Sequence, residues 1–164
     1  MSTEKVFNRI PDTITPINYD LTFNCNLKDD YKYTGFLILE VDIKTPTDTL
    51  LLNVDDVQVT KVACGMNKGE PKVEKENQIV KIKFDSVLAK GKTKISIDFT
   101  GCHGGKTNGF YVSKYMGKDG KECINLSTQF ESTFARRAFP CIDEPDRKAT
   151  FTISMVVPDN LVAI

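Results

Sequence analysis

The feature that most constrains the fold of this chain is an alternation of apolar and polar residues with a period of two. Successive side chains of a β-strand point to opposite faces, so each such run predicts a strand with one face on a core and the other nearer water. The pattern recurs in residues 19–27, 37–43, 80–84, 95–99 and 151–157. No long window has the period near 3.6 that an amphipathic helix needs.

The segments between these runs are rich in residues that form turns. Asp119-Gly120 separates residues 111–115 from residues 122–126, and an Asp-Gly pair between two extended stretches is a strong hairpin signal. Short helical turns are expected around residues 133–138 and after Pro145, which suits a first helical position. We therefore predict an all-β fold, an antiparallel β-sandwich or saddle-like pair of sheets with one or two short helical turns.

Composition fits one soluble domain or an incomplete part of a larger one. Of the 164 residues, 40% are hydrophobic and 27% are charged, which is ordinary for a globular protein. The 22 Lys and Arg balance the 22 Asp and Glu, so no net field attracts nucleic acid or an anionic membrane. Neither is expected as a partner.

The cysteines and the N-terminus indicate the compartment. Five cysteines at irregular spacings, without a Cys-x-x-Cys pair, predict free and mostly buried thiols. They are Cys25, Cys64, Cys102, Cys123 and Cys141. The N-terminal residues lead into no apolar signal segment, and no apolar run approaches membrane-spanning length. These features favour a reducing, cytoplasmic compartment.

A zinc site within the chain is a weak alternative for some of these residues. Its candidate ligands are Cys102, His103, Cys123 and Cys141. Their spacing matches no common structural zinc site, in which paired ligands lie two to five residues apart. We expect residues 101–105 to form a flexible loop instead, and we expect no metal in this segment.

One segment is not required by any argument from composition or periodicity. It contains Gln129-Phe-Glu131, followed by Ala135-Arg-Arg-Ala-Phe-Pro-Cys-Ile-Asp-Glu-Pro145. This closely resembles the signature of the large zinc aminopeptidases, the family of aminopeptidase N and the puromycin-sensitive aminopeptidase. Residues 16–21 and 109–115 resemble other segments of that family, so the resemblance extends over the whole chain.

The resemblance implies which part of such an enzyme this chain is. All matched residues belong to the N-terminal β domain, so residues 1–164 are expected to be that domain, truncated before the catalytic zinc domain. The zinc-binding His-Glu-x-x-His is absent, since His103 is the single histidine. The segment is therefore expected to hold no catalytic residue and to be inactive alone, while zinc belongs to the full-length enzyme. The apolar residues 160–164, with no turn after them, also favour a fragment.

Gln129 and Glu131 are the residues expected to bind substrate. An aminopeptidase selects peptides by their free α-ammonium group. The Glu131 carboxylate can accept hydrogen bonds from this group, while Gln129 offers a donor and an acceptor to the peptide backbone. Two residues apart on an extended segment, their side chains would share a face. The resemblance implies the same roles, an amine anchor at Glu131 and a wall of the first specificity pocket at Gln129. The alternative is that both are ordinary polar residues on a half-exposed strand.

The charged pairs around residues 139–141 have a structural interpretation. We expect Arg136 and Arg137 to form ion pairs with Asp143 and Glu144 that hold an irregular loop. A clamp for a substrate carboxylate is less suitable, because an enzyme that accepts long peptides has no use for one at this end. Cys141 is expected to pack in the core.

Two functions are compatible with these residues. The first is the substrate-anchoring domain of a cytoplasmic zinc metallo-aminopeptidase, a hydrolase that removes N-terminal residues from peptides. Its partners would be the peptide N-terminus and the missing catalytic domain. The alternative is a non-catalytic β-sandwich interaction or scaffold module derived from the same family. Retention of Glu131 favours the enzyme, because a scaffold has no need of an amine anchor.

Overall fold

The computed structural model describes residues 9–25, 31–104 and 106–164, and these residues form an all-β fold, as predicted. The strands are β1 (Ile14–Cys25), β2 (Lys32–Ile43), β3 (Thr47–Asn53), β4 (Gln58–Cys64), β5 (Asn67–Glu74), β6 (Ile79–Leu88), β7 (Gly91–Cys102), β8 (Gly109–Met116), β9 (Glu122–Gln129) and β10 (Thr150–Val156). Two single-turn 3-10 helices are η1 (Lys75–Asn77) and η2 (Ala135–Arg137). Each predicted run lies in a strand, except that Val157 follows the end of β10 and that residues 26 and 27 lie outside the described residues.

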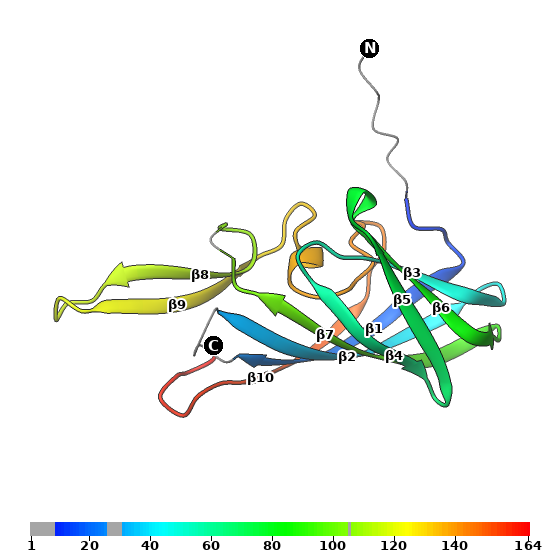
Figure 1. Ribbon diagram of the computed structural model, residues 1–164, viewed down its shortest axis with the longest axis horizontal. Helices are drawn as coiled ribbons and strands as arrows, with labels where there is room; N and C mark the ends of the chain where they lie inside the picture. The colour runs from blue at the N-terminus through cyan, green and yellow to red at the C-terminus, as the bar shows by residue number, and fades with distance from the viewer. Residues whose placement is uncertain (1–8, 26–30, 105) are drawn as a thin grey trace, which may run out of the picture.

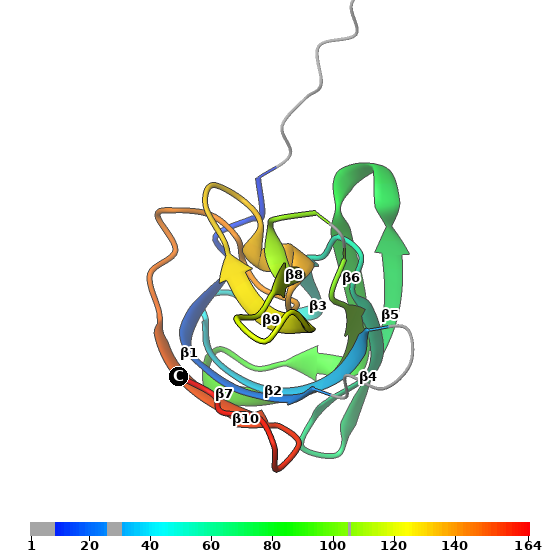
Figure 2. The same cartoon turned by 90° about the vertical axis from the view of Figure 1, so that its left-hand side faces the viewer.

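Eight of the strands form one curled sheet in the order β10-β1-β2-β7-β4-β5-β6-β3, and β8 and β9 form a separate hairpin. The paired strands are antiparallel apart from β1 and β10, which run parallel. The hairpin around Asp119-Gly120 was predicted, and it projects from the body of the molecule (Figure 1). Viewed from that side, the large sheet curves around the base of the hairpin and η2 (Figure 2).

The core lies on the inner face of this curved sheet. Leu21, Leu37 and Ile97 lie side by side on β1, β2 and β7, and all three are fully buried. Gly35 has no side chain and leaves space for the ring of Phe99. A Cβ atom at Gly35 would lie 2.1 Å from Cζ of Phe99. The alternating pattern thus places one face of each central strand in the core.

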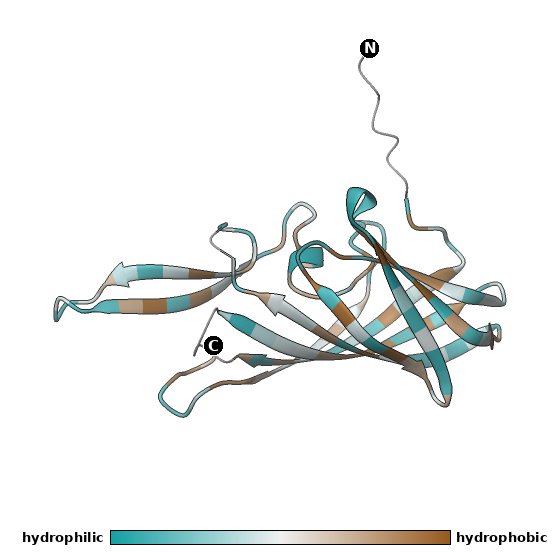
Figure 3. Cartoon of the chain, in the orientation of Figure 1, coloured by the Kyte–Doolittle hydropathy of each residue, from teal (hydrophilic) through white to brown (hydrophobic). Residues whose placement is uncertain are grey.

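The prediction that alternate residues of β10 face a core is wrong. Phe151, Ile153 and Met155 are 52%, 59% and 38% exposed. The strand is correctly predicted, but it lies at an edge of the large sheet, where Phe151 is partly covered by Tyr19 and Phe139. Figure 3 shows the apolar residues along the sheet and the hairpin.

Two local expectations also need correction. The chain after Pro145 makes a single turn, in which the Arg147 amide donates to the Glu144 carbonyl at 3.0 Å, and then continues into β10 instead of starting a helix. Residues 101–104 are no flexible loop, because β7 continues to Cys102 and the His103 side chain is buried. The His103 amide donates to the Tyr31 carbonyl at 2.7 Å, and its ring packs between Tyr33 and Phe110. Gly105 lies outside the described residues.

None of the five cysteines forms a disulfide, as predicted, but their burial differs from the expectation. Cys25 and Cys141 are buried, Cys64 and Cys123 are half-buried, and Cys102 is exposed. Only two of the five therefore belong to the core. Alternation predicts which face of a strand a residue takes, and the packing of other elements then decides how far that face is covered.

Candidate functional site

The segment that carries the signature leaves β9 and turns back across the curved sheet. The Phe134 amide donates to the Phe130 carbonyl at 2.8 Å, and η2 follows directly. Farther on, Asn53 and Cys141 form an isolated antiparallel bridge, with hydrogen bonds of 2.7 and 3.2 Å between their main chains. The segment is thus fixed to the end of β3, which is distant in sequence.

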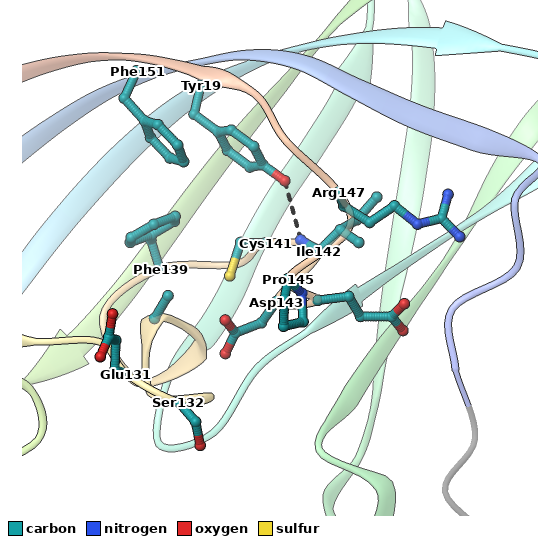
Figure 4. Close-up of a pocket in the computed structure, with 12 residues that line it drawn as sticks. Tyr19, Glu131, Ser132, Phe139, Cys141, Ile142, Asp143, Pro145, Arg147 and Phe151 are labelled. Atoms are coloured by element: carbon teal, nitrogen blue, oxygen red, sulfur yellow. Dashed lines mark hydrogen bonds between the residues drawn. The ribbon is translucent and has the colours of Figure 1, made fainter.

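A pocket of about 410 Å³ lies beside this segment. Its apolar wall is formed by the rings of Tyr19, Phe139 and Phe151 together with Ile142, and Tyr19 and Phe151 stack with centroids 5.0 Å apart and planes 8° apart. Figure 4 shows these side chains. Three carboxylates also line the pocket, those of Glu131, Asp143 and Glu144. An aromatic wall with carboxylates beside it is suited to a cation that has an apolar body.

The two predicted substrate-binding residues take different places. Glu131 lines the pocket, beside Phe139 in Figure 4, whereas Gln129 is the last residue of β9 and is not in the pocket wall. Both are exposed, and the Gln129 side-chain amide donates to the Glu131 carbonyl at 3.4 Å. The strand ends at Gln129 and a turn begins at Glu131, so the rule that places residues i and i+2 on one face does not apply here. Their roles in binding stay a prediction.

The three pocket carboxylates differ in their partners. Asp143 accepts from Nε of Arg136 at 2.9 Å, as the sequence predicts, and both side chains are nearly buried. Glu144 accepts from the Ile10 amide at 2.7 Å and pairs with Arg9. Within the described residues the Glu131 carboxylate has no hydrogen bond and no ion pair, so it alone of the three is available to a ligand.

Arg137 does not pair with Glu144, contrary to the expectation. Its Nε donates to Oδ2 of Asp55 at 2.8 Å, and its Nη1 donates to Oδ1 of Asn108 at 2.8 Å. Asp55 precedes β4 and Asn108 precedes β8, so both partners come from outside the signature. Sequence reasoning missed them because no local pattern indicates which distant loops meet.

Tyr19 and Cys141 also line the pocket. The Ile142 amide donates to the Tyr19 hydroxyl at 3.1 Å, which ties the signature segment to β1. Burial raises the pKa of Tyr19 and of Cys141, so both groups stay neutral. Cys141 is therefore packed core, as predicted. Tyr19 was predicted as a strand residue, and its place in the pocket follows only from the pairing of β1 with β10.

The described residues offer no zinc centre. Among residues 9–25, 31–104 and 106–164, no three His, Cys, Asp or Glu side chains form a group that could hold a metal ion. Neither ring nitrogen of His103 has a hydrogen-bond partner within these ranges, and the ring is enclosed by two aromatic side chains. This surrounding suits a neutral packed imidazole and not a metal ligand.

Comparison with known proteins assigns the family. Residues 15–164 match the Peptidase M1 N-terminal domain. The chain belongs to this family of β domains, and the resemblance derived from the sequence is confirmed.

Individual relatives are aminopeptidases. The chain is 33% identical to the puromycin-sensitive aminopeptidase of Caenorhabditis elegans over 164 residues, covering 96% of this chain and 17% of the relative. It is 36% identical to aminopeptidase M1-C of Oryza sativa subsp. japonica, covering 95% and 18%. It is also 36% identical to mitochondrial aminopeptidase 2 of Saccharomyces cerevisiae, covering 93% and 16%. The chain thus spans about a sixth of the length of these relatives. In the described part of the chain, no helix has the length and apolar character needed to cross a bilayer.

Proposed function

We propose that residues 1–164 are the substrate-anchoring N-terminal domain of a cytoplasmic zinc metallo-aminopeptidase, truncated before its catalytic domain. Family membership and the names of the relatives support the enzyme class. The observation that carries the anchoring role is the Glu131 carboxylate, which lines the pocket and has no partner among the described residues. Neighbouring Asp143 and Glu144 are occupied by Arg136 and Arg9.

In this proposal Glu131 binds the N-terminal ammonium group of a peptide. An ammonium has three donors and no acceptor, and an unpaired carboxylate is its natural partner. One charge-assisted hydrogen bond contributes roughly 1.5–3 kcal/mol, which is about one to two decades in affinity. Gln129 offers its amide to the first peptide group, since it lies beside Glu131.

The reaction itself belongs to the rest of the proposed enzyme. Zinc in such an enzyme activates the attacking water, and the ligands of this ion would lie outside residues 1–164. The contribution of this chain is to hold and orient the substrate amine. The chain alone is expected to hydrolyse no peptide.

The test uses the longer enzyme. Glu131→Gln removes the charge with little change in volume, so we expect KM for peptides with a free N-terminus to rise about tenfold to a hundredfold, as one lost charge-assisted bond implies. The change in kcat should be small, because the anchor holds the substrate before and during the reaction alike. Glu122→Gln, an exposed carboxylate of the hairpin, is the matched control. An unchanged KM in Glu131→Gln would remove the anchoring role.

One observation favours the alternative function, a non-catalytic interaction module. The apolar residues of β10 are exposed, and an uncovered apolar strand is suited to contact with another protein surface. The sequence of the longer reading frame distinguishes the two functions. A continuation without His-Glu-x-x-His would eliminate the aminopeptidase and leave the interaction module.

A further inference from the structure

Arg137 lies where three parts of the molecule meet. Its guanidinium contacts Asp55 before β4, Asn108 before β8 and the ring of Phe134, whose centroid is 5.5 Å from Cζ. The side chain is largely buried, and Nη2 also lies 2.7 Å from the Asp55 carboxylate. A planar guanidinium can serve several such partners at once, which a lysine cannot.

The contact with Asn108 lies at the base of the hairpin. Gly109 follows Asn108 directly and has φ of +71°, and a Cβ atom there would lie 2.6 Å from Cβ of Arg137. The stem of Arg137 therefore lies against the Gly109 backbone, while its Nη1 binds Asn108. Gly109 is the cross-strand partner of Gln129. Arg137 therefore packs against the residue that pairs with the last residue of β9.

The contact with Phe134 lies at the other end of residues 129–134. Phe134 closes the turn that contains Glu131 through its hydrogen bond to Phe130, and its ring lies against the Arg137 guanidinium. Residues 129–134 are thereby held at both ends by groups that touch Arg137. The Asp55 carboxylate connects this arrangement to the large sheet.

We propose that Arg137 is a positioning residue, which places Gln129 and Glu131 for the substrate amine without touching the substrate. This inference rests on the proposed function. It assigns Arg137 a role different from that of its neighbour Arg136, whose side chain is committed to Asp143 and Gln78.

The kinetic test compares variants of the longer enzyme. Arg137→Gln should raise KM for free-amine peptides about fivefold to tenfold and leave kcat within about twofold. Arg137→Lys should give a smaller rise, because it keeps the charge beside Asp55 and loses the bridge to Asn108. Lys114→Gln removes a cation from the far end of the hairpin and should change neither constant. An unchanged KM in Arg137→Gln would overturn the proposal.

A double variant separates positioning from general loss of structure. If Arg137 acts through Glu131 and Gln129, the combination of Arg137→Gln with Glu131→Gln should raise KM by less than the product of the two single effects. Fully multiplicative effects would contradict the proposal. Asn108→Ala provides a second route if Arg137→Gln does not fold, because it removes one partner and leaves the Asp55 ion pair in place.

Hydrogen exchange gives a readout that does not depend on activity. In Asn108→Ala and Arg137→Gln, the amides of residues 109–111 and 127–131 should exchange faster, while those of residues 114–116 and 122–124 stay unchanged. If this pattern appears but Glu131→Gln leaves KM unchanged, Arg137 still orders residues 127–131 and it is the proposed function that fails. If Glu131→Gln raises KM and neither Arg137→Gln nor Asn108→Ala alters exchange or KM, the positioning role fails alone.

Discussion

Two neighbouring strands of the large sheet present the same kind of face to different surroundings. In β1 the apolar residues of this face are buried, whereas in β10 their parallel partners are exposed. The pairs are Tyr19 with Phe151, Leu21 with Ile153 and Phe23 with Met155. Both strands show the same alternation in sequence. The comparison shows that periodicity determines which side chains share a face and leaves open whether another element covers it.

The energetic consequence should be large. A buried side chain contributes through the area removed from water and through its packing, and an exposed one contributes little of either. Ring contacts of Phe23 with Tyr33, Phe99, Phe110 and Phe139 cover the inner face of β1. Only Phe151 in β10 has comparable contacts, to Tyr19 and Phe139.

The largest effect is expected from truncating the covered member of one pair. Leu21→Ala should lower the free energy of unfolding by about 2–5 kcal/mol, because it leaves a cavity in a closely packed core. Ile153→Ala, its partner on β10, should change that free energy by less than about 0.5 kcal/mol. Urea denaturation of this chain measures both. Equal losses would mean that the face of β10 is covered in solution.

An intermediate effect on the free energy of unfolding is expected at the stacked pair of Tyr19 and Phe151. Phe151→Ala removes the ring stacked on Tyr19, and an aromatic pair of this kind contributes about 0.5–1.5 kcal/mol beyond its buried area. Phe151→Leu is the control, since it removes the ring and keeps most of the apolar side chain. If Phe151→Leu is as stable as the parent chain in urea denaturation, the stacking contributes nothing.

The smallest effect on the free energy of unfolding at neutral pH is expected from replacing His103, a buried polar side chain. Burial lowers the pKa of His103 from its ordinary value of 6.5, so in acid the unfolded chain binds a proton before the folded chain does. Its share of stability is therefore complete above pH 6.5 and is lost as the pH falls from 6.5 to the lower pKa of the folded state.

His103→Leu should remove that acid dependence. We expect the difference in unfolding free energy between the variant and the parent chain to grow in favour of the variant from pH 7.5 to pH 5.5. Urea denaturation at both pH values measures it. A difference that does not change with pH would show that His103 has the same pKa in the folded and unfolded chains.

Much of the fold was predictable from local patterns. Alternation predicted the strands, Asp119-Gly120 predicted the hairpin, and the segment with Gln129 and Glu131 predicted the family. The parallel pairing of Tyr19 with Phe151 was not predictable, since 132 positions separate the two and no turn signal connects them. The same holds for Arg137, whose partner Asp55 lies 82 positions away.

The candidate site divides in the same way. The presence of Glu131 and the pairing of Arg136 with Asp143 follow from the signature, where the residues are close in sequence. The aromatic wall of the pocket and the occupation of Glu144 by Arg9 depend on contacts across the whole chain. The sequence therefore predicted that Glu131 binds the substrate amine. Only the structure distinguished its unpaired carboxylate from the paired carboxylates of Asp143 and Glu144.

The amino-acid sequence by itself determined that this protein is all-β, where most strands lie, and to which family it belongs. These properties depend on the two-residue repeat of an extended backbone and on short runs of side chains, which act locally. Tertiary structure alone decided that β10 is exposed, that His103 is buried, and that Arg137 joins the hairpin to the sheet. These contacts join segments that are distant along the chain, so no local pattern encodes them.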